Sequence, residues 1–588
     1  MRIDRVYVIL SLSMLILVSC QQPVTKIEIK SDTMQNIDQT NVTDYLTKLS
    51  GYTTKYFINS DNNFSDYGFN GNGSQSNPFI IENLVVLDDF DIAIEIFNTT
   101  KHFIIKDSNI ATGARGIILG NVSKNTASII SNQFQGSMSG GLLIYDSPGV
   151  YVFNNTFDKS QMYTALRLTN CNDSCINQNK MLGQPRGNIE IKNSNGTEIS
   201  NNTLQKSNIK IYENQAYLYD TYIVFNNTIS GKEFGFFANN NNLIINTQIY
   251  ACLFIAFCNN ITIRNQYIEE IGEGLTILNS NEIFVENCSL IMCYDGIIVE
   301  SCSNVYISDN YLCYCGWGIS VHLSNDVDIF ENNIMNCTMF GVVVWSNSTL
   351  IENNTIRADH TAVKLWGDRD NIIINNYLSE CLVSVDMLFS YDSAIIGNNC
   401  SANRNNGMFV SKSRDILVSN NLFDRKGTKN SYALQVWICQ RVTLTYNTFQ
   451  NYQSDGLYIS SSNSCLIMNN EFRYNGHAIS VWSNSFYNII YDNIFFENGY
   501  GSQCSDSGIG NVWYNETLKL GNFWSNYNDE GYYYLGGTAG TYDKYPRSTI
   551  APTTYPSVAI NSIESLVIFA IICCMSILRR FFRKNTPF

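Results

Sequence analysis

Hydrophobic and polar positions alternate along most of the chain in short runs with a fixed repeat. A run such as Gly341-Val342-Val343-Val344-Trp345 places apolar side chains at every second position, which is the pattern of a half-buried β-strand. An Asn-rich marker recurs at positions 108, 132, 155, 179, 202, 227, 247, 266, 288, 310, 333, 354, 376, 399, 421, 447, 470 and 493. Steps of about 22 residues, with no helical periodicity inside a unit, indicate stacked repeats.

Each repeat is predicted to form one turn of a parallel β-helix, so that the fold class is an all-β solenoid of about 18–19 turns. The marker asparagines have a physical role in such a fold. Asn tolerates the left-handed backbone conformation that a sharp corner between strands requires. In stacked turns, equivalent side chains lie about 4.8 Å apart, so their amides are expected to hydrogen-bond along a column.

The segments on either side of the repeats divide the chain. Residues 1–22 have the pattern of a secretory signal, and Leu17-Val18-Ser19-Cys20 resembles a lipoprotein cleavage box, so both lipidation of Cys20 and ordinary cleavage are open. We expect the remaining segments to be a polar spacer (23–50), an N-terminal cap (51–78), the repeats (79–498) with an insertion near 214–220, an aromatic cap (499–550), a linker (551–557), a transmembrane helix (558–578) and a basic cytoplasmic tail (579–588). This order predicts a single-pass membrane protein with the solenoid outside the cell.

Charge changes the picture in one respect. The formal net charge is −14 and only 15% of the residues are charged, so the chain lacks the basic patch that nucleic-acid binding requires. Nucleic acid is therefore excluded as a partner.

The repeats, the lead-in Asn77-Pro78-Phe79-Ile80-Ile81-Glu82-Asn83-Leu84 and the aromatic motif Gly521-Asn522-Phe523-Trp524-Ser525-Asn526-Tyr527 followed by Asp543-Lys544-Tyr545-Pro546 resemble a known family. The chain is similar over about residues 65–548 to right-handed parallel β-helix proteins of the NosD type and their archaeal surface relatives. The resemblance implies a secreted or membrane-facing protein. It also implies carbohydrate binding or processing, or an accessory role for a copper enzyme as in NosD.

One outward column is the candidate binding site. The outward position at the end of successive strands holds Glu300, His322, Trp345 and Trp366, and further along the chain it holds Trp437 and Trp482. Aromatic rings flanked by charges can stack on a sugar chain while polar groups hold its hydroxyls. The alternative is that these tryptophans are packing residues. We expect a non-catalytic surface module that binds carbohydrate or another surface molecule, with a polysaccharide lyase or hydrolase as the alternative.

Catalysis would require converging carboxylates. The weak catalytic candidates are Asp359, Asp368, Asp386 and Lys364. A calcium-dependent lyase site could use Asp359, Asp368 and Asp370 with Lys364 and Arg369, although these residues also fit solvated turns. The four histidines, His102, His322, His360 and His477, are too scattered to predict a copper site, so no metal site is predicted.

The cysteines follow the repeat. Cys293, Cys315 and Cys337 are spaced by 22 residues, and stacked neighbours at about 4.8 Å lie within disulfide range. Cys171 and Cys175 are close enough for a local bond. Disulfides between these residues and an inward column of free thiols are both consistent with the spacing.

Overall fold

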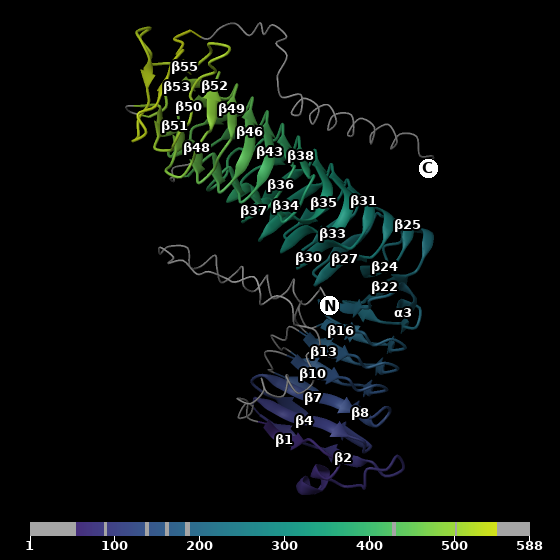
Figure 1. Cartoon of the computed structure of the whole chain (residues 1–588). Helices are drawn as coiled ribbons and strands as arrows, with labels where there is room; N and C mark the ends of the chain where they lie inside the picture. The colour runs from purple at the N-terminus through teal and green to yellow at the C-terminus, as the bar shows by residue number, and fades with distance from the viewer. Residues whose placement is uncertain are drawn as a thin grey trace.

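The chain folds as a long parallel β-solenoid, as the repeats predict. The structure, a computed structural model, describes residues 54–87, 91–135, 140–158, 164–182, 188–425, 431–499 and 502–549. Within these ranges about 18 turns stack along one axis (Figure 1). Each turn places short strands on three faces, and strands pair in parallel with their counterparts in the next turn except at one break in the middle of the solenoid.

The first face, called face 1, carries the candidate binding column. Its strands are β1 (Thr54–Ile58), β4 (Ile92–Thr99), β7 (Arg115–Val122), β10 (Gly140–Tyr145), β13 (Thr164–Thr169), β16 (Asn188–Lys192), β19 (Ile209–Tyr212), β22 (Lys232–Ala238), β24 (Tyr250–Ala256), β27 (Glu273–Leu278), β30 (Asp295–Glu300), β33 (Trp317–Phe330), β35 (Phe340–Glu352), β37 (Thr361–Trp366), β40 (Val383–Leu388), β42 (Met408–Ser411), β45 (Leu434–Trp437), β48 (Asp455–Ser460), β51 (His477–Val481) and β54 (Cys504–Asp506). Both β33 and β35 continue around the corner into face 2.

Face 2 follows face 1 in each turn. Its strands are β2 (Phe79–Glu82), β5 (Phe103–Lys106), β8 (Ala127–Ile130), β11 (Tyr151–Phe153), β14 (Cys175–Asn177), β17 (Glu198–Ser200), β20 (Ile223–Phe225), β23 (Asn241–Ile245), β25 (Asn259–Arg264), β28 (Asn281–Glu286), β31 (Ser303–Ser308), β38 (Ile372–Ile374), β41 (Ala394–Ile396), β43 (Arg414–Ser419), β46 (Gln440–Thr445), β49 (Leu466–Met468) and β52 (Ile489–Tyr491).

Face 3 completes each turn. Its strands are β3 (Val85–Val86), β6 (Asn109–Ala111), β9 (Gln133–Gln135), β12 (Thr156–Asp158), β15 (Lys180–Leu182), β18 (Thr203–Leu204), β21 (Thr228–Ile229), β26 (Tyr267–Glu269), β29 (Ser289–Ile291), β32 (Tyr311–Cys313), β34 (Asn333–Cys337), β36 (Thr355–Ala358), β39 (Tyr377–Leu378), β44 (Leu422–Asp424), β47 (Thr448–Gln450), β50 (Glu471–Arg473), β53 (Ile494–Phe496) and β55 (Phe523–Trp524).

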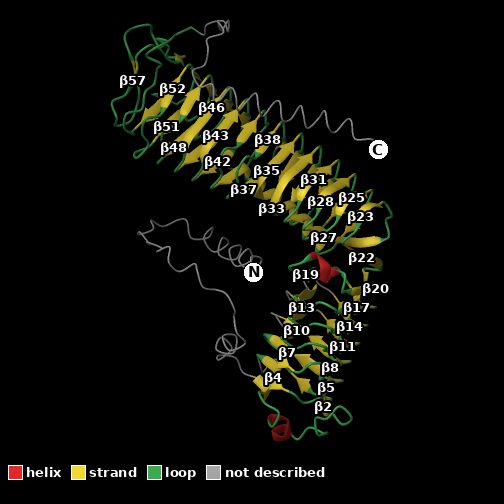
Figure 2. Ribbon diagram, turned by 45° about the vertical axis from the view of Figure 1, so that its right-hand side comes forward, coloured by secondary structure: helices red, strands yellow, loops and turns green. Residues whose placement is uncertain are grey.

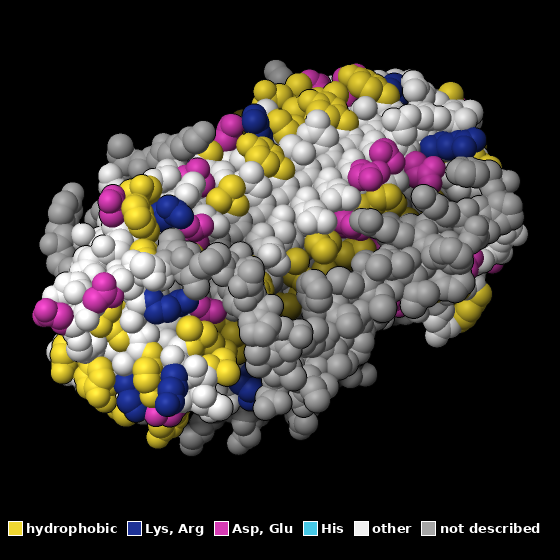
Figure 3. Space-filling model, turned by 90° about the horizontal axis from the view of Figure 1, so that it is seen from above, with side chains coloured by type: hydrophobic (Ala, Val, Ile, Leu, Met, Phe, Trp, Pro, Cys, Tyr) yellow, Lys and Arg dark blue, Asp and Glu magenta, His cyan; other side chains and the backbone are white. Residues whose placement is uncertain are grey.

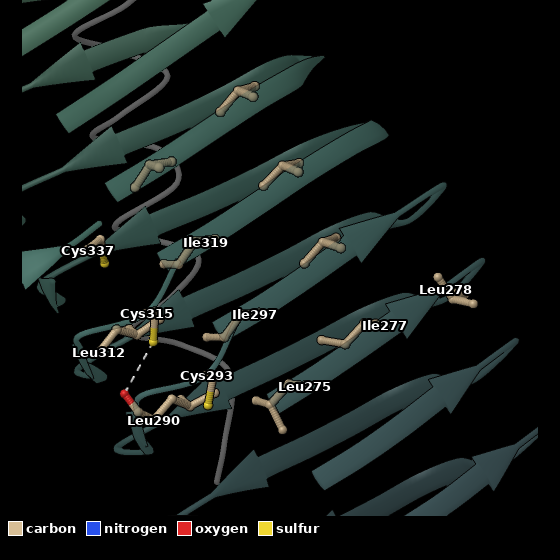
Figure 4. Packing of buried hydrophobic residues seen from close by; sticks show 14 of the residues in the cluster. Leu275, Ile277, Leu278, Leu290, Cys293, Ile297, Leu312, Cys315, Ile319 and Cys337 are labelled. Carbon is tan, nitrogen blue, oxygen red and sulfur yellow. Dashed lines mark hydrogen bonds between the residues drawn. The ribbon is translucent and has the colours of Figure 1, made fainter. Parts of the chain in front are cut away.

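The core is a stack of inward side chains that repeat with each turn. On face 1, Leu275, Ile297, Ile319 and Val342 are register partners in successive strands, and each is fully buried. Figure 4 shows these inward columns beside the cysteine column at a corner. Burying one such side chain stabilises the fold by about 1.5–3 kcal/mol, so the stacked turns supply most of the stabilisation.

The predicted asparagine column exists, but two of its members are shifted by one residue. At the corner between faces 2 and 3, the Asn332 backbone N–H and side-chain amide both donate to Asn354 Oδ1, at 2.9 and 3.0 Å. The markers placed at 333 and 399 are wrong, because Asn332 and Asn398 are the buried members. The residue before the ladder member adopts the left-handed conformation, for example Asn353 with φ 54°.

The solenoid bends where its two halves meet, near β22 (Figures 1 and 2). The face 1 ladder runs from β1 to β19 and resumes at β22, which pairs antiparallel with β21 before it joins β24. The short helix α3 (Ala216–Tyr219) lies in the expected insertion at this bend. Ion pairs join the halves here: Lys210 contacts Glu273, and Lys206 Nζ lies 2.6 Å from Glu270 Oε2.

The ends of the described chain carry other elements. The 3-10 helix η2 (Asn63–Tyr67) lies before the first full turn, and the hairpin β56 (Tyr533–Tyr534) and β57 (Tyr542–Asp543) follows the last one. After the last turn, Trp524 packs against Phe495, with ring centroids 4.5 Å apart, and its Nε1 donates to Asp543 Oδ2 at 2.9 Å. Seen from above, hydrophobic side chains gather in patches among few charged ones (Figure 3).

Part of the sequence prediction falls outside the described residues. The signal segment (1–22) with Cys20, the spacer (23–50), the linker (551–557), the membrane segment (558–578) and the basic tail (579–588) all lie there. Among the residues that the structure describes, no helix has the length and apolar character needed to cross a membrane.

Candidate functional site

The four predicted binding residues lie in one column on the outer surface of face 1. Glu300, His322 and Trp345 are register partners in β30, β33 and β35. Trp366, at the end of β37, continues the column. The His322 and Trp345 rings meet edge to face with centroids 4.8 Å apart, and the rings of Trp345 and Trp366 do so at 5.4 Å. All four side chains are partly exposed.

Burial sets the electrostatics of this column. It lowers the pKa of His322 to about 4, so that the imidazole is neutral at pH 7. Burial also raises the pKa of Glu300, and the negative charge of Glu273 acts in the same direction. Within the described ranges, His322 Nδ1 and Trp345 Nε1 are buried without a hydrogen-bond partner. The column is therefore mainly an apolar aromatic surface.

A charged pair and a second aromatic row flank the column. Lys364 Nζ lies 2.5 Å from Asp386 Oδ2 and 5.7 Å from the ring centroid of Trp366. The parallel row contains Trp317, Phe340 and His360, whose neighbouring ring centroids are 5.4 and 5.7 Å apart. The flat face thus offers rings and polar groups side by side.

The aromatic surface extends beyond the residues selected as the candidate site. Trp437 is 37% exposed and its ring lies 6.4 Å from that of Phe409. Trp482 is 55% exposed and its ring lies 5.9 Å from that of Tyr458. Trp437 occupies the same end-of-strand position as Trp366, and Trp482 directly follows β51. The repeat already predicts both tryptophans as members of the outward column, although they were not selected as candidate binding residues.

The structure does not bring the predicted catalytic acids together. Asp359 and Asp368 lie at opposite ends of β37, which spans six residues and thus about 20 Å. Asp386 lies on face 1 of the next turn and is neutralised by Lys364. This separation argues against the paired carboxylates that glycoside hydrolysis requires.

Asp368 is nevertheless unusual. It occupies a buried corner position whose neighbours in the adjacent turns are Ser346 and Ser390. Burial raises the pKa of Asp368 to about 7, although the Ser390 hydroxyl and the Asn371 amide favour the ionised form. Its location inside the wall of the solenoid makes it a structural group.

Asp359 lines an open surface hollow with a volume of about 260 Å³. The hollow is lined by Asn336, Arg357, Ala358, Asp359, Glu380, Ala402 and Arg404. Its charges are paired: Arg357 Nη2 lies 3.1 Å from Glu380 Oε1, and Arg404 Nη2 lies 3.3 Å from Asp359 Oδ1. The acids considered for a calcium site do not converge, because Asp359 lies before β37 whereas Asp368 and Asp370 follow it.

The cysteines are interior thiols. All 15 cysteines of the described residues are free, including the disulfide candidates Cys293, Cys315, Cys337, Cys171 and Cys175. Cys315 Sγ donates to Leu290 O at 3.7 Å, as Figure 4 shows, and contact with Cys315 raises the pKa of Cys293. Cys171 Sγ likewise donates to Thr169 O at 3.2 Å. Cys171, Cys293, Cys315 and Cys337 are buried and pack as small apolar groups, whereas Cys175 is half-buried.

These features define a parallel β-solenoid with an aromatic outer face. The family model described as "Periplasmic copper-binding protein (NosD)" matches residues 47–233, 218–380 and 346–529. The chain therefore belongs to the NosD family. A comparison with curated proteins found no match.

Several solved structures are similar to this chain at low sequence identity. The mannuronan C-5 epimerase AlgE6 A-module of Azotobacter vinelandii is 10% identical, with 78% of this chain and 99% of that chain covered and a TM-score of 0.31. The tailspike protein of E. coli bacteriophage HK620, in complex with pentasaccharide, is 11% identical over 71% of each chain, with a TM-score of 0.28. PfbA, a surface adhesin of Streptococcus pneumoniae, is 9% identical, with 63% and 82% covered and a TM-score of 0.23.

The family description raises the question of copper. Copper sites are built from His, Cys and Met side chains that converge. Here His322 packs on Trp345, whereas His477 pairs with Asp455, Nδ1 to Oδ1, at 3.2 Å. In the part of the chain that the structure describes, no group of three His, Cys, Asp or Glu side chains could hold a metal ion. The described residues therefore do not fit a copper site.

Proposed function

We propose that this protein is a non-catalytic surface module that binds carbohydrate on face 1. The observation that carries the proposal is the row of edge-to-face rings formed by His322, Trp345 and Trp366 on the outer surface of a parallel sheet. Aromatic rings offer large, rigid, apolar contact areas at a low cost in side-chain entropy. One side of a sugar ring presents C–H groups that pack on such surfaces.

The surroundings of the rings support the same function. The ion pair of Lys364 with Asp386 borders Trp366 and supplies a donor and an acceptor for sugar hydroxyls. The strand spacing of about 4.8 Å places the groups of successive turns in a line along the axis, which suits a polymer better than a compact ligand. The separation of Asp359, Asp368 and Asp386 favours binding without cleavage.

The proposal includes a location. The sequence patterns of residues 1–22 and 558–578 support export of the solenoid and its attachment to a membrane through the C-terminal segment. Glycans of the cell surface or of the surroundings would then be accessible to face 1. Protease treatment of intact cells tests this location, because an exterior solenoid is digested whereas an interior one is protected.

A glycan array with product analysis tests the function directly. The full-length chain in mild detergent is applied to neutral and acidic polysaccharides, with and without calcium, and the soluble products are analysed by mass spectrometry. We expect retention on one class of glycan with no new products. Cleaved or unsaturated products would replace the binding module with an enzyme, and absence of any retention would overturn the proposal.

A further inference from the structure

The corner that follows face 1 differs between the two halves of the solenoid. In the N-terminal half the left-handed residue at this corner is Asn98, Asn121, Asp146, Asn170 or Asn193, with φ between 46° and 56°. Their side chains form a ladder, such as Asn121 Nδ2 to Asn98 Oδ1 at 2.8 Å. In the C-terminal half four turns carry Leu323, Phe389, Lys412 and Ile438 at this corner, with φ 49°, 56°, 50° and 55°, whereas other turns keep polar or glycine residues there (Asn279, Ser301, Gly367 and Ser461).

Replacing Asn or Asp by these residues at the corner does not help the protein to fold. A left-handed conformation is strained for an ordinary side chain, and it is most unusual for a β-branched residue such as Ile438. The apolar replacements also face water, because Leu323 is 49% exposed, Phe389 38% and Ile438 44%. Strained residues that expose apolar side chains are typical of functional surfaces.

The replacements directly adjoin the aromatic face. Ile438 follows Trp437, and Lys412 bridges two rings, with its Nζ 5.0 Å from the centroid of Phe389 and 5.7 Å from that of Trp437. Together Phe389, Lys412, Trp437 and Ile438 form an exposed platform, which we call the corner platform.

The charge of Lys412 distinguishes this platform from the rest of the face. Lys364 is neutralised by Asp386, and Arg441 by Asp415, whereas Lys412 forms no ion pair with a carboxylate in the described part of the chain. Its ammonium group is exposed and is held by the two rings. A positive charge fixed between aromatic rings is complementary to a sugar that carries a negative group.

We propose that the corner platform is a subsite for an anionic saccharide, in which Trp437 stacks on the sugar ring and Lys412 pairs with its carboxylate or sulfate group. This inference rests on the carbohydrate-binding function proposed for face 1. It adds the class of the sugar: a polymer with acidic units, despite the net charge of −14 of the chain.

Three soluble probes test the subsite on the full-length chain: polygalacturonate, chondroitin sulfate and dextran. We expect the acidic polymers to bind at least fivefold more tightly than dextran, with an affinity that falls as salt is added. Lys412→Gln should weaken only the acidic polymers, by about fivefold, as for a partly exposed ion pair. Lys412→Arg should retain the preference, and Trp437→Ala should weaken all probes.

Lys519→Gln is the matched control, since Lys519 is also exposed and left-handed, with φ 51°, but lies away from face 1, shortly before β55. Equal affinity for dextran and the acidic polymers, or equal effects of Lys412→Gln and Lys519→Gln, would overturn the anionic subsite and leave the function of face 1 standing. Absence of binding to every probe would overturn both. Thermal melts establish that each variant is folded.

Discussion

The indole ring of Trp345 meets that of Trp366 edge to face, with centroids 5.4 Å apart and planes at 85°. The two residues are 21 positions apart in the sequence and come together because β35 and β37 pair in parallel in adjacent turns. Residues that are separated by one repeat in the sequence are therefore in contact on the surface. The same relationship produces the inward core, the asparagine ladder and the aromatic face.

The glycine at the second position of several face 1 strands, such as Gly318 in β33, is predicted to be required for stacking there. A Cβ added at Gly318 would lie 2.4 Å from Gly341 O in the next turn, which is closer than any contact allows. Gly318→Ala should therefore lower the free energy of unfolding by about 1–3 kcal/mol. Gly113→Ala is the control, because nothing lies within 4 Å of its Cβ position, and chemical denaturation of both variants measures the difference.

The asparagine ladder makes a prediction for two adjacent residues. Asn332 is buried and donates to Ile307 O and to Asn354 Oδ1, whereas Asn333 is exposed. Asn332→Ala leaves several buried groups unpaired and should cost about 2–4 kcal/mol, while Asn333→Ala should cost less than about 0.5 kcal/mol. Equal melting temperatures for the two variants would contradict the assignment of the ladder.

The raised pKa of Asp368 leads us to expect that the stability of the protein depends on pH. Because its pKa is raised from 3.8 to about 7 in the folded state, the native protein holds a proton that the unfolded chain releases between these values. Its contribution to stability is therefore present below pH 4 and is lost as the pH rises to 7. Asp368→Asn should stabilise the protein at pH 8 by at most about 4 kcal/mol and have little effect at pH 4. Denaturation at the two pH values measures this, and an equal effect at both would contradict it.

For His322 we expect stability to depend on pH in the opposite direction. Burial lowers its pKa from 6.5 to about 4, so the unfolded chain binds a proton in this range and the native protein does not. Stability is then fully present above pH 6.5 and falls as the pH drops to 4, by at most about 3 kcal/mol. His322→Gln should remove this fall. His477 serves as a contrast, because its hydrogen bond to Asp455 raises its pKa, and that contribution is lost on the alkaline side.

The sequence predicted the repeat and the outward column because both depend on alternation and spacing alone. It misplaced the ladder at Asn333, since either member of an Asn-Asn pair can point inward and the local turn decides which does. The sequence indicated the bend at β22 only through an irregular spacing of the repeat markers in that region. The corner platform was missed because residues such as Ile438 give no signal that the backbone beneath them is left-handed.

The most direct test of the central claim compares two pairs of exposed rings. Trp345→Ala with Trp366→Ala removes the column on face 1, whereas Tyr311→Ala with Tyr377→Ala removes rings of 39% and 41% exposure from face 3. Glycan retention and melting temperature are measured for each. The account predicts a loss of about 30-fold for the tryptophan pair, from about 1 kcal/mol per ring, and no loss for the tyrosine pair. Unchanged retention by a folded tryptophan variant would contradict the account.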